Sequence, residues 1–221
     1  SQLVINELDA DTPSTDTLEF IELKSAAPNF SLNGYVLVFF NGFSNGLGNV
    51  SYNAIDLDGY STDINGIFLI GNSLVSPTPS FIIPNASIQN GPDAVAIYYA
   101  NDTDFPIDSP ATLTNLIDAI AYSNSATNGP TTLMTALGLT SFINENQTSS
   151  ATSKSISRNS DGTYSVVNPT PGINNDGTGV VLNGISVSTS ITELTENESF
   201  VITFTTQFPV STSNLVLNYS L

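Results

Sequence analysis

Seven acidic residues, gathered in two loops, are the side chains of this sequence with the clearest capacity for chemistry. The first cluster comprises Asp9, Asp11 and Asp16, which lie between two strand-like runs, together with Glu19 at the start of the second run. The second cluster lies in the segment DLDGYSTD and comprises Asp56, Asp58 and Asp63. Carboxylates that crowd one loop repel each other unless a cation neutralises them, and oxygen-only ligands suit calcium. The sequence therefore predicts structural calcium at these residues.

Both clusters also have a simpler interpretation. An aspartate at a turn accepts hydrogen bonds from nearby backbone amides and keeps the surface soluble. The Asp-x-Asp-Gly pattern of the second cluster resembles calcium loops, but the full helix-loop-helix register and the distal bidentate glutamate are missing. Calcium sites and ordinary turn aspartates therefore both stay open on the sequence alone.

The lack of cysteine and histidine removes most catalytic chemistries. Without them the chain has no disulfide, thiolate zinc site, cysteine nucleophile or imidazole base. A serine nucleophile elbow and a phosphate-cradling glycine loop are missing as well. We therefore expect a protein that is not an enzyme.

Three further carboxylates, Glu7, Glu22 and Asp118, lie inside runs that otherwise look like core. Paired carboxylates can hydrolyse glycosidic bonds, but clefts of that kind are usually lined by tryptophan, and this chain has none. The alternative is structural, with a partly buried carboxylate that accepts hydrogen bonds from loop amides or a hydroxyl. We favour the structural role.

Composition excludes several partners. Twenty acidic residues against three basic ones give a formal charge of -17, while 40% of residues are hydrophobic, which is enough for a core. Affinity for phosphates comes from lysine and arginine, so nucleic acid and anionic membranes are disfavoured. No apolar run approaches the roughly 20 residues of a membrane-spanning helix. We expect no nucleic-acid binding and no membrane insertion.

Short runs rich in Val, Ile, Phe and Tyr alternate with turn signals, which is typical of an antiparallel β-sandwich. The opening runs are LVINEL (Leu3–Leu8) and LEFIEL (Leu18–Leu23). Further strands are predicted at Tyr35–Asn41, Val50–Leu57, Gly66–Gly71, Asp93–Tyr99, Leu116–Tyr122 and Thr163–Val167. Positive φ is favoured at seven turns: Asn33-Gly34, Asn41-Gly42, Asn45-Gly46, Asp58-Gly59, Asn65-Gly66, Asn90-Gly91 and Asp161-Gly162. The fold class is therefore all-β.

Two segments depart from this strand pattern. Pro130–Leu139 has the apolar spacing of a short helix that ends before Gly138, and we interpret it as a cap on the sandwich rather than a ligand-binding helix. Asn168–Gly179 is rich in Pro and Gly without hydrophobic periodicity, so it is predicted to be a linker.

The region after the linker supplies three strand-like runs: Ile185–Thr189, Ser199–Thr205 and Asn214–Leu221. Three strands bury too little apolar surface to form a sandwich of their own, so we interpret them as part of a second module. The alternative is that they pack onto the first domain and complete it. The predicted organisation is residues 1–174 as one sandwich, 175–184 as linker and 185–221 as the N-terminal part of a second β-sandwich.

The motifs, taken in order, resemble a bacterial lamin tail domain, an immunoglobulin-like β-sandwich of secreted and surface proteins. The resemblance begins with the LVINEL and LEFIEL runs and continues through five later segments: LNGYVLVFFN (32–41), DLDGYSTDINGIFLIG (56–71), NGPDAVAIYY (90–99), LIDAIAY (116–122) and NPTPGIN (168–174). It covers roughly the first four fifths of the chain. The tail resembles, more weakly, the opening of a calcium-exchanger β-type or similar immunoglobulin-like repeat.

The resemblance implies a non-catalytic module, secreted or displayed on the cell surface, that serves adhesion, spacing and contact with proteins or glycans within a larger exported polypeptide. Ser1 followed almost at once by a strand fits a mature exported chain. One alternative is an accessory N-terminal module of a secreted nuclease or phosphatase whose catalytic domain lies beyond residue 221. Another is a structural subunit of a surface assembly.

Overall fold

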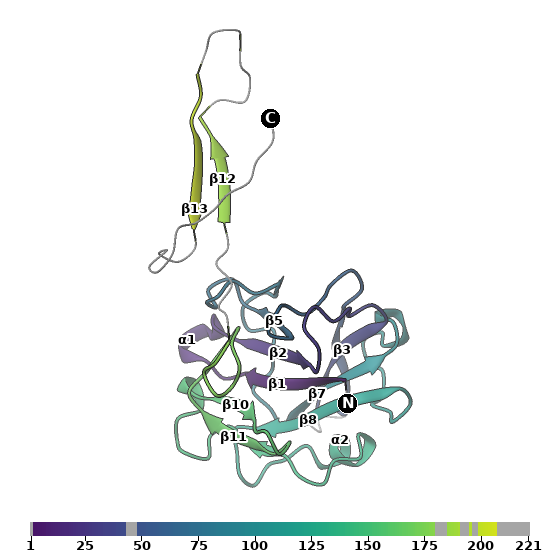
Figure 1. Ribbon diagram of the computed structural model, residues 1–221. Coiled ribbons are helices and arrows are strands. Elements are labelled where there is room, and N and C mark those ends of the chain that lie inside the picture. Colours follow the sequence, from purple (N-terminus) through teal and green to yellow (C-terminus); the bar gives the residue numbers. More distant parts are fainter. Residues whose placement is uncertain (1, 43–47, 180–184, 191–194, 196–198, 207–221) are drawn as a thin grey trace. The chain divides into compact units, whose positions relative to one another are not determined.

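The computed structural model describes residues 2–42, 48–179, 185–190, 195 and 199–206. The chain divides into two compact units, Ser1–Val180 and Val181–Leu221. Each unit is described by itself, and the first contains nearly all of the elements in Figure 1.

The first unit is an all-β sandwich of two sheets, as predicted (Figure 1). One sheet has the order β11-β10-β1-β2-β5-β6 and contains Tyr164–Val167, Ser155–Arg158, Leu3–Asp9, Phe20–Ser25, Ile67–Gly71 and Phe81–Ile82. The other has the order β4-β3-β7-β8-β9 and contains Val50–Asp56, Tyr35–Asn41, Asp93–Tyr99, Leu116–Ser123 and Ile143–Asn144. Neighbouring strands are antiparallel except β5 with β6 and β8 with β9, which are parallel.

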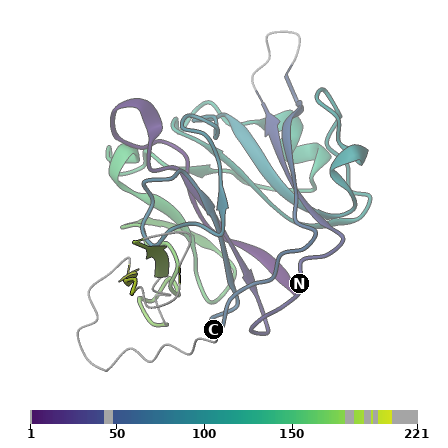
Figure 2. The same cartoon turned by 90° about the horizontal axis from the view of Figure 1, so that it is seen from above.

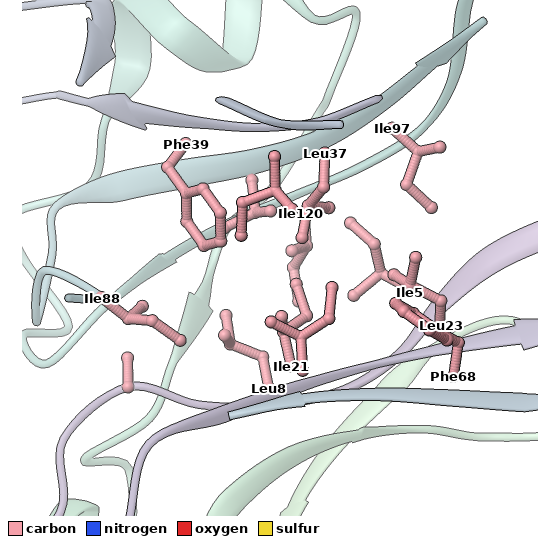
Figure 3. Packing of buried hydrophobic residues seen from close by; sticks show 14 of the residues in the cluster. Ile5, Leu8, Ile21, Leu23, Leu37, Phe39, Phe68, Ile88, Ile97 and Ile120 are labelled. Atoms are coloured by element: carbon pink, nitrogen blue, oxygen red, sulfur yellow. The ribbon is translucent and has the colours of Figure 1, made fainter. Parts of the chain in front are cut away.

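The core lies between the two sheets. Side chains of β1 and β2 alternate between the two faces of the sheet, and a bulge between Ile5 and Glu7 shifts the alternation in β1 by one residue. Ile5, Leu8 and Ile21 therefore all reach the core. Figure 3 shows Leu37 and Phe39 of β3 facing them from the opposite sheet. All five side chains are buried. This interior is the rigid support for the loops described below.

The second sheet is buried on its outer face as well. There the alternate residues of β3, among them Val36 and Phe40, pack with Tyr98 against Leu133 from α2 (Thr131–Ala136) and Phe105, which follows η1 (Asp102–Asp104). The predicted helical cap is thus confirmed. Burial on both faces explains why YVLVFF is hydrophobic without alternation.

Most predicted strands are confirmed within one or two residues, and β3 and β7 coincide with the prediction. Three further strands, β6, β9 and β10, are not predicted from the sequence. β6 and β9 have only two residues each, and β10 (SISR) is too polar to give a strand signal. β10 nevertheless pairs directly with β1, a pairing that no local pattern specifies.

Five of the seven predicted turn glycines have positive φ: Gly34, Gly59, Gly66, Gly91 and Gly162. Gly42 does not, so that prediction was wrong. Glycine is required there by a close approach instead, because a Cβ on Gly42 would lie 2.3 Å from the carbonyl oxygen of Pro92. The Asn45-Gly46 turn lies outside the described residues.

Replacing Gly66 by alanine is expected to lower the free energy of unfolding by about 2 to 4 kcal/mol, because a left-handed residue gains a side chain that has no space. The φ of Gly66 is +77°, and its Cβ would lie 2.7 Å from the carbonyl oxygen of Ser25. Gly59→Ala is the matched control, since φ is +84° and nothing lies within 4 Å. The control should cost only about 1 kcal/mol in urea unfolding. If the two variants lost the same free energy of unfolding, the close approach to Ser25 would not be the cause of the loss.

In the second unit the structure describes a two-stranded antiparallel ladder of β12 (Ile185–Thr189) and β13 (Ile202–Thr206). These strands correspond to the first two predicted runs of the tail. The third predicted run, Asn214–Leu221, lies outside the described residues. Figure 2 shows the chain from above.

Candidate functional site

The first predicted calcium cluster is divided by the fold. Asp16 follows Pro13 in a distorted turn, α1 (Pro13–Asp16), where its Oδ1 accepts a 2.8 Å hydrogen bond from the Thr12 amide. Glu19 is fully buried and accepts hydrogen bonds from the amides of Ser87 (2.9 Å) and Ile88 (3.1 Å). Glu19 therefore anchors another loop and its oxygens are already engaged.

Asp9 and Asp11 lie close to a carboxylate that the sequence analysis did not select, Glu145. Glu145 is fully buried, and its Oε1 accepts a hydrogen bond from the amide of Ala10 (3.1 Å). Burial raises the pKa of Asp9 to about 9, and repulsion from Glu145 adds to this effect. Burial likewise raises the pKa of Glu145 to about 8, with repulsion from Asp11 and Asp16 added. Burial and the charge of Asp16 also raise the pKa of Asp11. Asp9 and Glu145 therefore favour their neutral forms at neutral pH.

The residues of the second predicted cluster serve separate turns. The Oδ1 of Asp56 accepts from the Asp58 amide (2.9 Å), and the Oδ1 of Asp58 accepts from the Gly34 amide. The Oδ1 of Asp63 accepts from the amides of Asn65 and Ile67, both at 2.8 Å. These contacts match the simpler interpretation of turn aspartates.

Among the residues that the structure describes, no three acidic side chains are grouped so that they could hold a metal ion. The donor sets found here, with most oxygens engaged by backbone amides, therefore do not form a calcium cage as they stand. Calcium binding at either cluster stays a prediction.

Glu7 and Glu22 are neighbours across β1 and β2 and are both fully buried. Glu7 accepts hydrogen bonds from the amide (2.8 Å) and hydroxyl (2.7 Å) of Thr170. Glu22 accepts from the amide of Gly172 (2.7 Å) and the side chain of Asn6 (2.7 Å). The predicted structural role of these carboxylates, with loop amides and a hydroxyl as donors, is confirmed.

These contacts correct the interpretation of the predicted linker. Asn175 also belongs to the first unit, because its side-chain amide donates to the carbonyls of Asn6 and Arg158, both at 2.9 Å. The segment from Thr170 to Asn175 is therefore attached to the first sheet, and the chain divides at Val180. The high Pro and Gly content was misleading, because it indicates an irregular backbone and does not indicate that the segment is separate from the domain.

Asp118 contacts β1 at Ile5, two residues before Glu7. Its Oδ2 accepts a 2.8 Å hydrogen bond from the amide of Ile5 and lies 4.0 Å from Nη1 of Arg158. Burial raises the pKa of Asp118, while these two partners oppose the effect. Asp118 thus joins the two sheets, which is a structural role.

Two hollows on the described part of the first unit exceed about 300 Å³, the lower end of the usual size of a ligand pocket. The first, which we call the amide groove, has a volume of about 540 Å³. Its lining has aromatic, amide and hydroxyl side chains and no charged residue: Ala119, Ile120, Ala121, Gly138, Leu139, Thr140, Ser141, Phe142, Ile143, Asn144, Gln147, Gly162, Thr163 and Tyr164. The chain has a net charge of -17, so an uncharged groove of this size is an unusual part of its surface.

The second hollow, which we call the Asp9 pocket, has a volume of about 380 Å³. Apolar side chains form much of its lining, including Leu18, Phe20, Leu74 and Val75. Asp9 is the one charged residue in that lining. Asp9 is 5% exposed, and its Oδ1 has no hydrogen-bond partner among the described residues.

No protein-family model, curated protein or solved structure matches this chain. No helix among the described residues is long and apolar enough to cross a membrane.

Neither Glu145 nor the two hollows are predicted from the sequence. Glu145 stands in the polar segment Asn-Glu-Asn, where no periodicity marks it as buried. The available signal was indirect, since the chain has few glutamates and this one lies two residues after a short apolar stretch, Phe142 and Ile143. The hollows depend on loops that are far apart in the sequence, so no local pattern could indicate them.

Proposed function

We propose that the first unit is a non-catalytic contact module of a secreted or surface-displayed protein, and that it binds neutral glycans in the amide groove. The observation that carries this proposal is the uncharged, half-polar lining of the groove on a strongly acidic chain. Neutral sugars present hydroxyls for amide side chains and C–H faces for aromatic rings. The groove offers both kinds of partner.

The rigidity of the groove supports this proposal. The ring of Tyr164 has the guanidinium of Arg158 5.5 Å from its centroid, and its hydroxyl donates to the carbonyl of Ile5 (3.0 Å). Phe142 lies against Gly129, where any Cβ would come within 2.3 Å of the ring. Two fixed aromatic rings lower the ordering cost of binding.

We also propose that the first unit is an immunoglobulin-like sandwich of the lamin tail type. The opening motif supports it, because the LVINEL and LEFIEL runs form the adjacent central strands β1 and β2. Export, display at the cell surface and a role in adhesion or spacing within a longer polypeptide are parts of the same proposal.

The groove is tested by titrating the chain with a panel of neutral oligosaccharides and following backbone amide shifts by NMR. Gln147 lies in the groove with an exposed side chain, so Gln147→Ala should weaken binding about 3- to 10-fold, the worth of one hydrogen bond. Gln2→Ala, an exposed glutamine that does not line the groove, is the matched control. Glycan contact is wrong if no panel member shifts the groove amides, and the groove is the wrong site if both variants bind alike.

A further inference from the structure

Lys24 and Asn174 bring an amine and a carboxamide together at the first sheet. Nζ of Lys24 lies 2.5 Å from Oδ1 of Asn174, closer than the usual range of about 2.7 to 3.2 Å for an N–H···O hydrogen bond. A carbonyl bond is about 1.23 Å long, so Nζ is at most about 3.7 Å from Cγ of Asn174. An amine attacks a carbonyl carbon from about 3 to 3.5 Å, so the two groups are close to the geometry of reaction.

The turn that carries Asn174 holds its carboxamide in one orientation. The backbone amide of Asn174 donates to the carbonyl of Thr178 (2.8 Å), and the amide of Gly177 donates to the carbonyl of Asn174 (2.7 Å). The side-chain Nδ2 of Asn174 donates to the hydroxyl of Thr178 (3.1 Å). The nitrogen of the carboxamide therefore faces the turn, and its oxygen faces Lys24.

Lys24 is held in place as well. Its side chain is half-buried, and its Nζ also donates to the carbonyl of Asn65. An amine held against a carboxamide has the advantage of an intramolecular reaction, because little entropy is lost in bringing the reactants together. Even a backbone nitrogen, which is a much weaker nucleophile, attacks an adjacent asparagine carboxamide in the first step of deamidation.

Glu22 supplies an acid beside the pair. Glu22 and Lys24 are two residues apart on β2, so their side chains project from the same face of the strand. Oε2 of Glu22 accepts a 2.7 Å hydrogen bond from the amide of Gly172, which lies two residues before Asn174. Glu22 therefore holds the segment of one reactant against the strand of the other.

Glu22 is also suited to moving protons. Burial raises its pKa to about 8, although two hydrogen bonds and the charge of Lys24 oppose the effect. A carboxyl group with this pKa both gives and takes protons near neutral pH, as a general acid and base must. Among the residues that the structure describes, Lys24 forms no direct ion pair, so a water must carry protons between its Nζ and Glu22.

We propose that the side chains of Lys24 and Asn174 join in a covalent isopeptide bond, with Glu22 as the proton carrier. The new bond forms between Nζ of Lys24 and Cγ of Asn174, and the bond from Cγ to Nδ2 breaks with its electron pair left on the nitrogen. Two protons pass from Nζ, by way of water and Glu22, to that nitrogen, which departs as ammonium. Atoms and charge balance, so the step requires no further reactant.

The bond ties β2 to a segment that follows the last strand of the first unit, 150 positions later in the chain. A covalent link over such a span restricts the unfolded chain, as a disulfide does, and this chain has no cysteine to form one. Neither Lys24 nor Asn174 lines the amide groove. The inference is therefore independent of the proposed glycan contact.

Mass spectrometry of the purified, unfolded chain tests the bond. Loss of ammonia should lower the intact mass by about 17 Da. Trypsin cleaves an unlinked chain into residues 1–24, 25–154, 155–158 and 159–221, whereas a linked Lys24 resists cleavage and leaves residues 1–154 joined to 159–221. A succinimide at an asparagine also loses ammonia, but it leaves Lys24 cleavable. Release of residues 1–24 from the whole sample overturns the proposal.

Two variants and an internal comparison assign the bond. Lys24→Arg keeps the positive charge and Asn174→Ala removes the carboxamide, so both should have the full mass. Lys154 and Asn168 form the same kind of contact at an exposed site, where neither group is held as firmly. Lys154→Arg should therefore lose about 17 Da like the parent chain. Loss of ammonia that persists in Lys24→Arg overturns the proposal.

The role of Glu22 is tested by Glu22→Gln, which keeps the size of the side chain but cannot carry a proton. The linked fraction should fall at least about tenfold, within the usual range for loss of a general acid or base. Glu7→Gln is the matched control, because Glu7 is a fully buried acid paired with Glu22 across the two strands. A merely structural role would lower the linked fraction equally in both variants, and that result overturns the assignment of Glu22 as proton carrier.

Discussion

Replacing Glu7 by alanine is expected to lower the free energy of unfolding by about 3 to 5 kcal/mol, because buried hydrogen-bond donors lose their acceptor. Glu7 is fully buried and accepts hydrogen bonds from three groups: the amide of Thr170, the hydroxyl of Thr170 and the hydroxyl of Ser155. Alanine leaves all three donors unpaired and creates a cavity. The largest local effect should be at the Thr170–Asn175 segment, whose attachment to the first sheet depends on these hydrogen bonds.

Chemical denaturation measures this loss, and hydrogen exchange at the amides of Thr170 and Gly172 locates it. Glu7→Gln keeps the shape and one acceptor oxygen, so it should cost less than Glu7→Ala. Asp102→Ala is the surface control, because Asp102 is exposed. One ordinary hydrogen bond contributes about 1 kcal/mol to stability. A smaller decrease than this in the free energy of unfolding of Glu7→Ala would therefore contradict a structural role.

The free energy of unfolding should fall as the pH rises from about 5 to 8, by at least about 1.4 kcal/mol per pH unit, the slope of one fully titrating carboxyl. Burial raises the pKa of Asp9 to about 9 and the pKa values of Glu22 and Glu145 to about 8. The pKa of an unfolded carboxyl is about 4. Between these values the folded chain keeps protons that the unfolded chain has released, so stability is fully present near pH 4 and is lost as the pH rises through the folded pKa values.

Urea unfolding at a series of pH values tests this slope. Asp9→Asn and Glu145→Gln replace two of the titrating acids by neutral side chains and should flatten the profile. Repeating the series at high salt removes the repulsion between surface charges, which also grows with pH, while buried groups are screened much less. A free energy of unfolding that rises from pH 5 to 8 would show that these carboxyls are ionised in the folded chain.

Much of the first unit could be predicted from its sequence, because alternation and turn glycines act locally. The strands Tyr35–Asn41 and Asp93–Tyr99 were predicted to the residue. The order of strands in the sheets could not be predicted, since β10 pairs with β1 about 150 residues away. Only the packing of the whole unit selects that neighbour.

The candidate sites were less predictable than the fold. The acidic loop after β1 is predicted to bind calcium, which stays a prediction, and its neighbour Glu145 comes from a distant segment. The carboxylates Glu7 and Glu22 were recognised as structural, yet their donors lie in the segment interpreted as a linker. Side-chain types can be read locally, whereas hydrogen-bond partners depend on the folded backbone.

The attachment of Thr170, Gly172 and Asn175 to the opening strands has a consequence for biosynthesis. Those contacts join residues 150 to 169 positions apart, and they supply the donors for Glu7 and Glu22. While a ribosome is still making the middle of the chain, the two glutamates have no such donors and must remain hydrated. The first sheet can therefore close over them only after residue 175 has emerged, which makes completion of this unit a late event in translation.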